Sequence, residues 1–353
     1  MRAIEYSQPG DSSVLQLVER DVPPPGPDEV RIRVVVSGVN PTDWKARQGG
    51  GFARATGFPA TVPNQDGAGI VDAVGPRVSG FTVGDRVWVY LAAHERPTGT
   101  AQEYTVLPAE RVRHLPDNAG FDVGASLGVP AMTAHRALTV AAGGPSRLSP
   151  GALRGRTILV AGGAGAVGHA TIQLARWAGA EVIATVSAPE KAALAAAAGA
   201  HHVVNYREGD TAAAIRTFAP RGVDQIVEVS PAENAELNAH VIANHGTVSV
   251  YGADGRPMTI PARDHLALNV RYQFVLLYTI GREALAAAAE DIGHALLDDA
   301  LPVGTEAGLP VTRYALEHTR QAHDAVRDGA IGKVVIDVAP GQAADAPIRS
   351  DPA

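Results

Sequence analysis

A glycine-rich turn between two apolar runs is the feature that most constrains what this chain can fold into. Residues 157–161 and 181–186 are short apolar runs typical of buried strands, and a helical pattern runs to about residue 178 between them. The turn at residues 162–168 has glycines at the spacing G-x-G-x-x-G. Glycine lets the backbone turn tightly and approach a pyrophosphate, whose charge is met by the first amides of the helix. The segment predicts a dinucleotide site formed by Gly163, Gly165, Ala166, Val167 and Gly168.

The runs around this unit predict an α/β fold with two parts. Further apolar runs at 202–205, 223–229, 247–251 and 274–277 bring the expected strands to six, the number in a doubly wound Rossmann sheet. Before about residue 127 the texture differs, because short β-type runs are separated by glycine and proline. We therefore expect a mostly-β first part and a six-stranded parallel sheet after it.

Composition excludes several classes of function. The 353 residues contain no cysteine, which removes disulfides and every cysteine-containing zinc site, and we expect no metal. Apolar runs are too short for a membrane helix, and the first residues lack the apolar core of a signal peptide. The net charge is -7 and no Lys/Arg run stands out, so nucleic acid is not an expected partner. These features predict a cytoplasmic protein that acts on a small molecule.

The end of the second predicted Rossmann strand indicates which dinucleotide is bound. An NAD site has an acidic residue there to hold the ribose 2′-hydroxyl, whereas this chain has Ser187, which we also expect to cap the next helix in a capping box with Glu190. Lys191, Tyr206 and Arg207 stand where they can surround a 2′-phosphate. The pattern favours NADPH.

With these motifs in view, the chain resembles the zinc-independent medium-chain dehydrogenases/reductases of the NADPH:quinone oxidoreductase (zeta-crystallin-like) family. The resemblance extends over nearly the whole chain. The segments that show it are residues 38–43, 66–69 with 74–75, 84–87, 129–134, 162–168, 205–208 and 332–335.

The resemblance implies a domain organisation and an assembly. A GroES-like catalytic domain is expected over residues 1–128, completed by residues 278–340, with the Rossmann NADPH-binding domain at 129–277 and a flexible tail at 341–353. The active site is expected in the cleft between the domains, and a homodimer is implied.

The resemblance also implies roles for individual residues. In this family, the residues that match Gly165, Gly168, Lys191 and Tyr206 contact the cofactor, and the one that matches Thr133 sits by the nicotinamide. We place Tyr251 and Lys333 with the cofactor contacts, and Ser187 with the 2′-phosphate. Asn40, Asp43, Trp44 and Asn64 form the expected substrate-binding set.

Reduction of a quinone or an α,β-unsaturated carbonyl needs hydride alignment and a donor at the oxygen that becomes negative. We assign Asn40 and Lys45 as catalytic residues, and prefer Lys45 to Asp43 because a cation favours an enolate oxygen. Many family members have a tyrosine where this chain has Lys45, so the proton source stays open.

Three alternatives remain at this point. A G-x-S-x-G match around Ser126 would indicate an α/β-hydrolase, but no apolar strand precedes the serine. A second alternative is a non-catalytic protein that binds NADPH. The third is an enoyl reductase of acyl thioesters or polyketide intermediates, for which Arg47, Arg54 and Arg96 could form a basic entrance for a phosphate.

Overall fold

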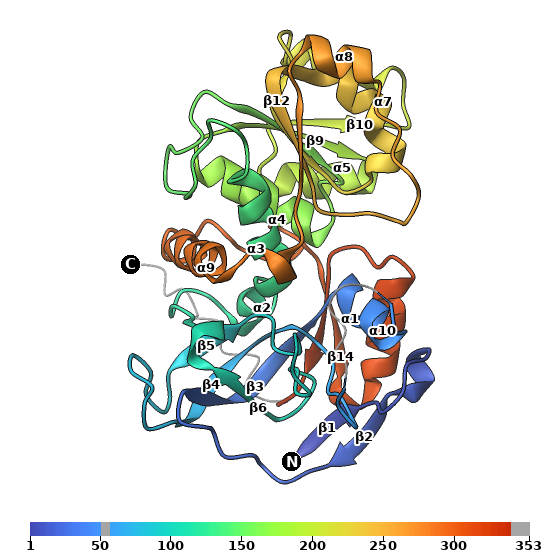
Figure 1. Ribbon diagram of the computed structural model, residues 1–353. Helices are drawn as coiled ribbons and strands as arrows, with labels where there is room; N and C mark the ends of the chain where they lie inside the picture. Colours follow the sequence, from blue (N-terminus) through green and yellow to red (C-terminus); the bar gives the residue numbers. More distant parts are fainter. Residues whose placement is uncertain (51–56, 340–353) are drawn as a thin grey trace, which may run out of the picture. The chain divides into compact units, whose positions relative to one another are not determined.

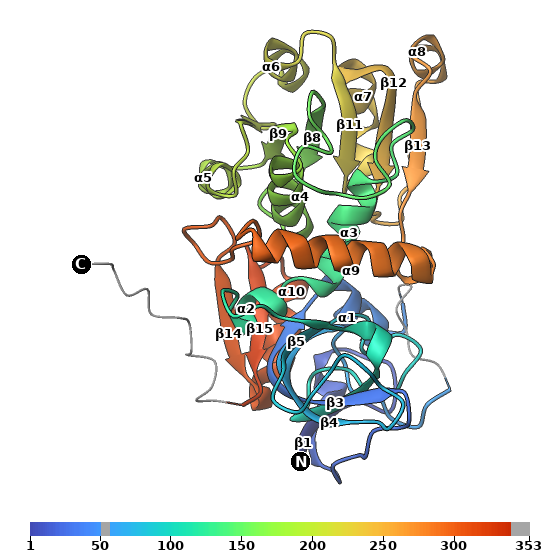
Figure 2. The same ribbon diagram turned by 90° about the vertical axis from the view of Figure 1, so that its left-hand side faces the viewer.

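The computed structural model describes residues 1–50 and 57–339 and divides into two compact units (Figures 1 and 2). One unit comprises Met1–Val129 and the segment from Val311, and the other comprises Pro130–Pro310. The tail predicted at 341–353 lies outside the described residues. In the ranges that the model describes, no helix combines the length and apolarity needed to cross a bilayer.

The first unit is built around one long strand, β3 (Glu29–Val39). It pairs antiparallel with β4 (Asp66–Val74), β6 (Tyr104–Pro108) and β15 (Lys333–Asp337). The sheet has the order β14-β15-β3-β4-β5-β7, and β1 and β2 form a separate antiparallel pair. The remaining strands of this unit are β1 (Arg2–Glu5), β2 (Gln16–Glu19), β5 (Arg86–Val89), β7 (Val112–His114) and β14 (Val311–Ala315).

The C-terminal strands form one edge of this sheet, where β15 pairs with β3. Val334 of β15 lies opposite Val39 of β3, and Ile336 lies opposite Ser37. Alternate residues of these strands point to one buried cluster, in which Val334 and Ile336 pack with Val34 and Ala322. Helices of this unit are α1 (Pro41–Arg47), α2 (Phe121–Gly124) and α10 (Thr319–Arg327), with short 3-10 helices at Ser12–Val14, Ala109–Arg111 and Leu316–His318.

The second unit contains the predicted six-stranded parallel sheet, which confirms the α/β fold class. Its order is β10-β9-β8-β11-β12-β13. From β8 the chain builds β9 and β10 on one side, and then crosses to build β11, β12 and β13 on the other side. The glycine turn follows β8 at this reversal, where open α/β sheets bind their ligands. The strands are β8 (Thr157–Ala161), β9 (Glu181–Val186), β10 (His202–Asn205), β11 (Val223–Glu228), β12 (Ile242–Val250) and β13 (Arg271–Phe274).

Helices connect these strands, as Figure 2 shows. In one set, α4 packs against β8 and β9, and α5 packs against β9 and β10. In the other set, α6 packs against α7. The helices are α3 (Gly128–Leu138), which begins at the unit boundary, α4 (Ala166–Trp177), α5 (Pro189–Ala197), α6 (Thr211–Phe218), α7 (Pro231–Val241), α8 (Ala262–Ala267), α9 (Arg282–Leu297) and a 3-10 turn at Leu277–Thr279.

Two local predictions in this unit need correction. The sixth strand runs from Arg271 to Phe274, so only Phe274 of the predicted run 274–277 lies in it, and a 3-10 segment begins at Leu277. The capping box at Ser187 and Glu190 is wrong: α5 begins at Pro189, with Ala188 as N-cap and no side-chain cap. Proline suits the first helical position because its missing N–H needs no partner there.

The segment 278–310 belongs to the second unit, whereas the sequence analysis assigned it to the first. Its helix α9 is held by the buried carboxylate of Asp291. This carboxylate accepts hydrogen bonds from His135 Nε2 (2.7 Å), Arg147 Nε (2.8 Å) and the Leu148 amide (2.7 Å). The sequence of α9 is rich in alanine and does not indicate which unit the helix packs against. The hydrogen bonds to Asp291 come from distant residues and leave no trace in the apolar pattern of the helix.

Asp291 predicts a pH dependence of stability. Burial alone would raise its pKa, but the bonds from His135, Arg147 and Leu148 outweigh burial and lower the pKa to about 2. A depressed carboxyl pKa stabilises the fold above the unfolded pKa of about 4, and that contribution is lost as pH falls toward 2. We expect Asp291→Asn to lower the free energy of unfolding by about 2 kcal/mol at pH 7.

Urea unfolding of the wild type and the variant at pH 7 and at pH 3 measures this effect, with a smaller difference expected at pH 3. Glu290→Gln is the control, because Glu290 pairs with the same Arg147 from an exposed position. Equal loss in both variants would contradict the role of the buried carboxylate.

Candidate active site

The glycine turn has the close packing that its residue types predict. A Cβ on Gly163 would stand 2.8 Å from Ala184 Cβ on β9, and a Cβ on Gly168 would stand 2.2 Å from the Gly162 carbonyl. Any side chain at either position would push the helix away from the strand. Gly162 itself has φ +71°, a conformation that favours glycine.

Gly165 faces open space at the start of α4. It is the N-cap of this helix, has no side chain to bond the first amides, and is exposed. A Cβ there would meet nothing closer than 3.5 Å. The first amides of a helix have no intrahelical partner, and they bind anions well. The turn therefore fits a pyrophosphate, with the amides of Ala166 and Val167 as its donors.

The residues predicted to surround a 2′-phosphate lie together. Lys191 Nζ donates to Ser187 Oγ at 3.0 Å, just after β9. The Tyr206 amide donates to the Val186 carbonyl at 3.0 Å, which brings the exposed Tyr206 side chain to the same strand end. No carboxylate stands at the tip of β9. Arg207 follows Tyr206 and is exposed.

Two other predicted cofactor residues lie in the second unit or at its boundary. Thr133 is buried in α3, and Tyr251 directly follows β12. The Tyr251 amide donates to the carbonyl of Glu228 (3.0 Å), and burial together with the Glu228 charge raises the pKa of Tyr251. Their contact with a cofactor stays a prediction.

Lys333 has a different setting, inside the first unit. Its side chain is 1% exposed, and the ammonium donates to Asn40 Oδ1 (2.8 Å) and Asp66 Oδ2 (3.3 Å). Asn40 Nδ2 in turn donates to Asp66 Oδ2 (2.7 Å), and the Val129 amide donates to Asp66 Oδ1 (2.8 Å). The three side chains Lys333, Asp66 and Asn40 form a closed buried cluster, here called the Lys333 cluster. The predicted cofactor contact of Lys333 stays a prediction.

The Lys333 cluster fixes the amide of Asn40, a residue that the sequence analysis placed near the reacting carbon. Both its polar atoms are bonded within the cluster, and the residue is 2% exposed. Burial raises the pKa of Asp66, while Lys333, Asn40 and the Val129 amide oppose this rise. Asp66 was part of a family motif but received no role, because a single acid at the start of an apolar strand gives no sign of its partners.

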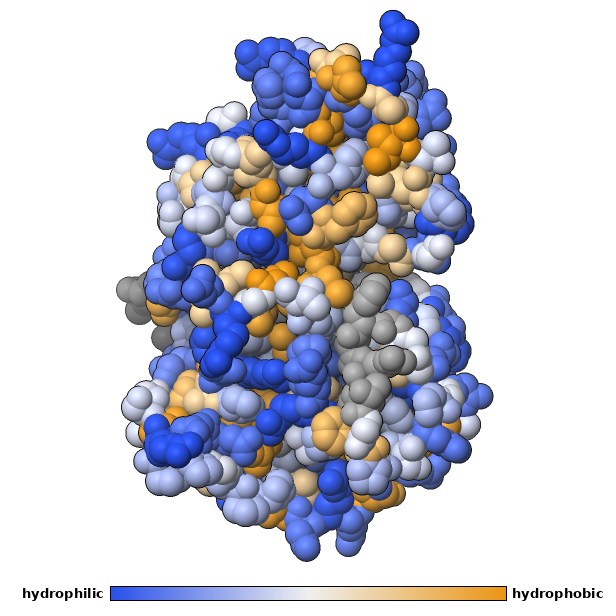
Figure 3. Space-filling model, viewed as in Figure 1, coloured by the Kyte–Doolittle hydropathy of each residue, from blue (hydrophilic) through white to orange (hydrophobic). Residues whose placement is uncertain are grey.

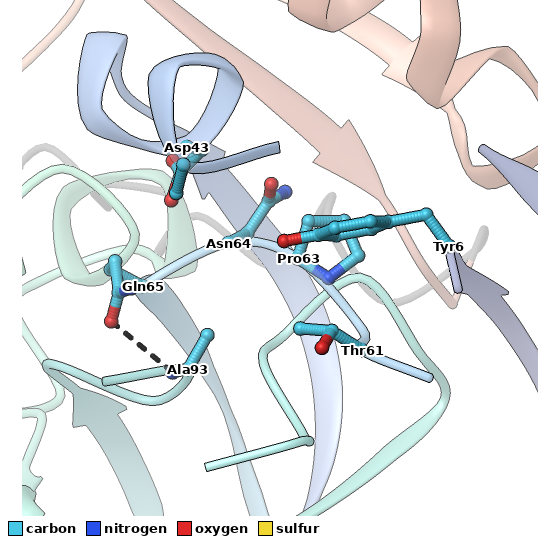
Figure 4. A pocket seen from close by; sticks show the side chains of 8 residues that line it. Tyr6, Asp43, Thr61, Pro63, Asn64, Gln65 and Ala93 are labelled. Atoms are coloured by element: carbon cyan, nitrogen blue, oxygen red, sulfur yellow. Dashed lines mark hydrogen bonds between the residues drawn. The ribbon is translucent and has the colours of Figure 1, made fainter. Parts of the chain in front are cut away.

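A small pocket in the first unit has about 10 Å³ of free space, room for about one water molecule (Figure 4). Five of the eight residues in its wall have polar side chains. It is lined by Tyr6, Asp43, Ala46, Thr61, Pro63, Asn64, Gln65 and Ala93. The sequence points to Asp43 and to the amides of Asn64 and Gln65, but Tyr6 and Thr61 stand in segments without a recognisable motif.

Asn64 is held firmly in this wall. Its backbone has φ +78°, and its amide donates to Ser37 Oγ (2.9 Å) and accepts from His323 Nε2 (2.9 Å). Burial, followed by the charge of Arg47, lowers the pKa of His323 to about 3, so its ring is neutral at pH 7. Neighbouring Gln65 accepts from the Ala93 amide (3.2 Å), as Figure 4 shows.

Lys45 and Trp44 do not line the pocket. The Lys45 ammonium lies 5.6 Å from the centre of the Trp44 ring, so the two side chains contact each other. Asp43, on the same helix α1, does line the pocket. The structure therefore places the residue that we ranked second, and not Lys45, at the candidate acceptor site.

The basic entrance expected for a thioester phosphate is wrong for two of its three residues. Arg47 is fully buried and donates to the Gly10 carbonyl (2.7 Å), and Arg96 pairs with Glu29 (2.8 Å). Arg54 lies outside the described residues. Ser126 follows helix α2 and donates to the Asp122 carbonyl, so it lacks the strand that a hydrolase nucleophile needs.

Comparison with family models identifies the class. Residues 26–117 match the alcohol dehydrogenase GroES-like domain, and residues 166–292 match a family described as zinc-binding dehydrogenase. The chain has no cysteine, and residues 1–50 and 57–339 contain no cluster of three His, Asp or Glu able to hold a metal ion. The fold and both matches are those of a medium-chain dehydrogenase/reductase.

Individual relatives narrow this class. The chain is 34% identical to a quinone oxidoreductase of Lama guanicoe, with 95% of this chain and 97% of the relative covered. It is 32% identical to a 2-haloacrylate reductase of a Burkholderia species over 65% of this chain and 66% of the relative. A mycobacterial protein solved in complex with NADPH has a TM-score of 0.77 and 29% identity, with 95% and 99% covered.

The chain belongs to the quinone oxidoreductase (zeta-crystallin-like) family. It is an NAD(P)H-dependent oxidoreductase whose Rossmann unit binds the cofactor.

The Lys333 cluster generates a stability prediction. Removal of one partner of a buried ion pair leaves the other charge uncompensated, which costs about 3 to 5 kcal/mol. We expect Lys333→Met to lower the free energy of unfolding by this amount, and the double variant Lys333→Met/Asp66→Asn to recover at least half of it. Arg77→Met, in the exposed pair with Asp28, is expected to change it by less than about 1 kcal/mol.

Denaturant unfolding of the four proteins, followed by circular dichroism, measures these differences. If the double variant is as unstable as the single one, the loss does not come from an unpaired carboxylate.

Proposed function

We propose that the chain is an NADPH-dependent reductase that delivers hydride to a quinone or an α,β-unsaturated carbonyl without a metal. The observation that best supports this is the polar pocket of the first unit, which combines Asp43, Tyr6 and Thr61 in a small space next to the fixed amide of Asn40. The free space inside it is about 10 Å³, which holds about one water-sized group. It therefore suits a single carbonyl oxygen of an acceptor and not a whole ring.

Hydride is the only chemistry that the bound nicotinamide must supply to such an acceptor. The chain contributes binding and charge. The amides at the start of α4 hold the pyrophosphate, Thr133 and Tyr251 are the proposed neighbours of the nicotinamide half, and the pocket holds the acceptor oxygen. The name of the Burkholderia relative supports a conjugated acceptor as well as a quinone.

The choice of NADPH over NADH depends on the tip of β9. Lys191 and Ser187 present an ammonium and a hydroxyl where an acidic residue would repel a phosphate, and Tyr206 lies at the same strand end. We propose that these three residues hold the 2′-phosphate. A charge-assisted bond from Lys191 contributes more than a neutral one.

Replacing Lys191 tests this preference. We expect Lys191→Ala to weaken NADPH binding about tenfold, the loss of about 1.4 kcal/mol of binding free energy, and to leave NADH binding unchanged. Fluorescence titration with both nucleotides measures it. Glu190→Gln, at the adjacent exposed position, is the control. Wild-type protein that binds NADH as tightly as NADPH would contradict the proposal.

A panel of acceptors tests the proposed reaction. The purified protein is mixed with NADPH and, separately, 1,4-benzoquinone, 9,10-phenanthrenequinone, a simple 2-enone or crotonyl-CoA, and loss of nicotinamide absorbance is followed. We expect rapid oxidation with a quinone or the enone. Activity with crotonyl-CoA alone would assign the chain to the enoyl reductases. Tight NADPH binding without oxidation by any acceptor would support the non-catalytic alternative.

We also propose a homodimer and a cytoplasmic location. β13 is an edge strand of the second unit, and Leu266 and Phe274 near it are 81% and 62% exposed. Figure 3 shows apolar side chains gathered on the surface of this unit. An exposed strand edge with apolar residues is suited to pairing with a second copy. A molecular mass of one chain by light scattering would contradict the dimer, and cell fractionation tests the location.

A further inference from the structure

We propose that Asp43 is the acid that gives a proton to the acceptor oxygen, an inference that rests on the proposed reductase function. From charge alone, Lys45 is the preferred donor, and the sequence leaves the proton source open. The structure instead brings the carboxyl of Asp43 into the wall of the acceptor pocket.

The two oxygens of Asp43 have different surroundings. Oδ2 accepts a hydrogen bond from the backbone N–H of Asn40 at 2.7 Å, which fixes the carboxyl at the first turn of α1. Oδ1 is buried, and no donor among the described residues meets hydrogen-bond geometry with it, although the Gln65 backbone amide is near enough to lower the pKa of the carboxyl. Figure 4 shows the carboxyl among the side chains that line the pocket. A buried polar atom left without a partner is costly, so an oxygen in this position is suited to bond a ligand.

The setting of Asp43 favours its neutral, protonated form. Burial first, and then the negative charge of Asp66, raise its pKa to about 8, against the opposing effects of the Asn40 amide and Lys333. At pH 7 the carboxyl therefore keeps its proton. Because Oδ2 accepts from the backbone, the proton belongs on Oδ1, which can donate into the pocket.

Other titratable groups around Asp43 are poorer proton donors. Burial, followed by the Asp43 charge, raises the pKa of Tyr6 to about 12, so its phenol is a much weaker acid. His323 is neutral, as shown above, and its Nε2 is bonded to Asn64. Lys333 is enclosed by Asn40 and Asp66, and Arg47 is a permanent cation.

NADPH, when bound, would supply hydride to the carbon of a conjugated acceptor, whose carbonyl oxygen would take up the displaced electron pair as an enolate. The O–H bond of Asp43 then breaks, its proton forms a new O–H bond on that oxygen, and Asp43 becomes a carboxylate. Water returns a proton to Asp43 before the next turnover. The resulting enol rearranges to the saturated ketone.

The variant Asp43→Asn removes the acidic proton of the carboxyl and keeps the size of the side chain. Its amide oxygen can still accept the hydrogen bond from the backbone N–H of Asn40. Since general acids contribute about 10² to 10⁴ in rate, we expect kcat with the 2-enone to fall by about 10²-fold at pH 7. The affinity for NADPH, measured by fluorescence, is expected to stay unchanged. Asp28→Asn is the matched control, the same chemical change at an exposed position of the same unit.

The pH profile separates proton donation from a structural role. The acid form is the active one, so wild-type kcat with the enone is expected to fall above about pH 8, by about tenfold per unit. In Asp43→Asn this falling limb is expected to disappear. If the variant does not fold by circular dichroism, the wild-type profile alone decides, and absence of a falling limb overturns the proposal.

The outcomes distinguish this inference from the function on which it rests. Wild-type protein that reduces no acceptor in the panel overturns the proposed function and the acid together. Wild-type protein that is active, with Asp43→Asn equal in rate and pH profile, overturns only the role of Asp43.

Discussion

The buried contact between the ammonium of Lys333 and the carboxylate of Asp66 is the interaction on which the candidate site depends. It joins β15 to β4 through Asn40, which stands between β3 and α1. Two charges taken out of water are stable only when each is paired and hydrogen-bonded, and here amide donors complete the arrangement. The start of α1 is consequently fixed, and with it the backbone amide that orients Asp43.

The same cluster also sets the electrostatics of the pocket. One negative charge, on Asp66, is neutralised by one ammonium, and a second carboxyl nearby would be a second, uncompensated charge. Burial and this neighbouring charge keep Asp43 protonated. Burial raises the pKa of both carboxyls, and the charge of Lys333 opposes the rise at each of them.

Much of the second unit could be predicted from the sequence, and little of the acceptor pocket could. The glycine turn works through local rules, because Gly163 and Gly168 must lack a side chain whatever the rest of the fold does, and six apolar runs predict a sheet. The polar pocket is different. Tyr6, Gln65 and Ala93 come from segments that only the folded unit brings together. No periodicity records that Lys333 pairs with a residue 267 positions away. The preference for Lys45 came from charge alone, without knowledge of which side of α1 faces the pocket.

The placement of β14 and β15 makes the second unit an insertion within the first. Residues 130–310 form a continuous unit, while the first unit needs segments from both ends of the chain. Contacts between residues so far apart form slowly, because a long loop must close before they stabilise anything. During synthesis the nucleotide unit can fold as soon as its own residues have emerged. Asp66, in contrast, has no cation beside it until Lys333 arrives, so we expect the start of α1 and the pocket wall that depends on it to become fixed late in folding.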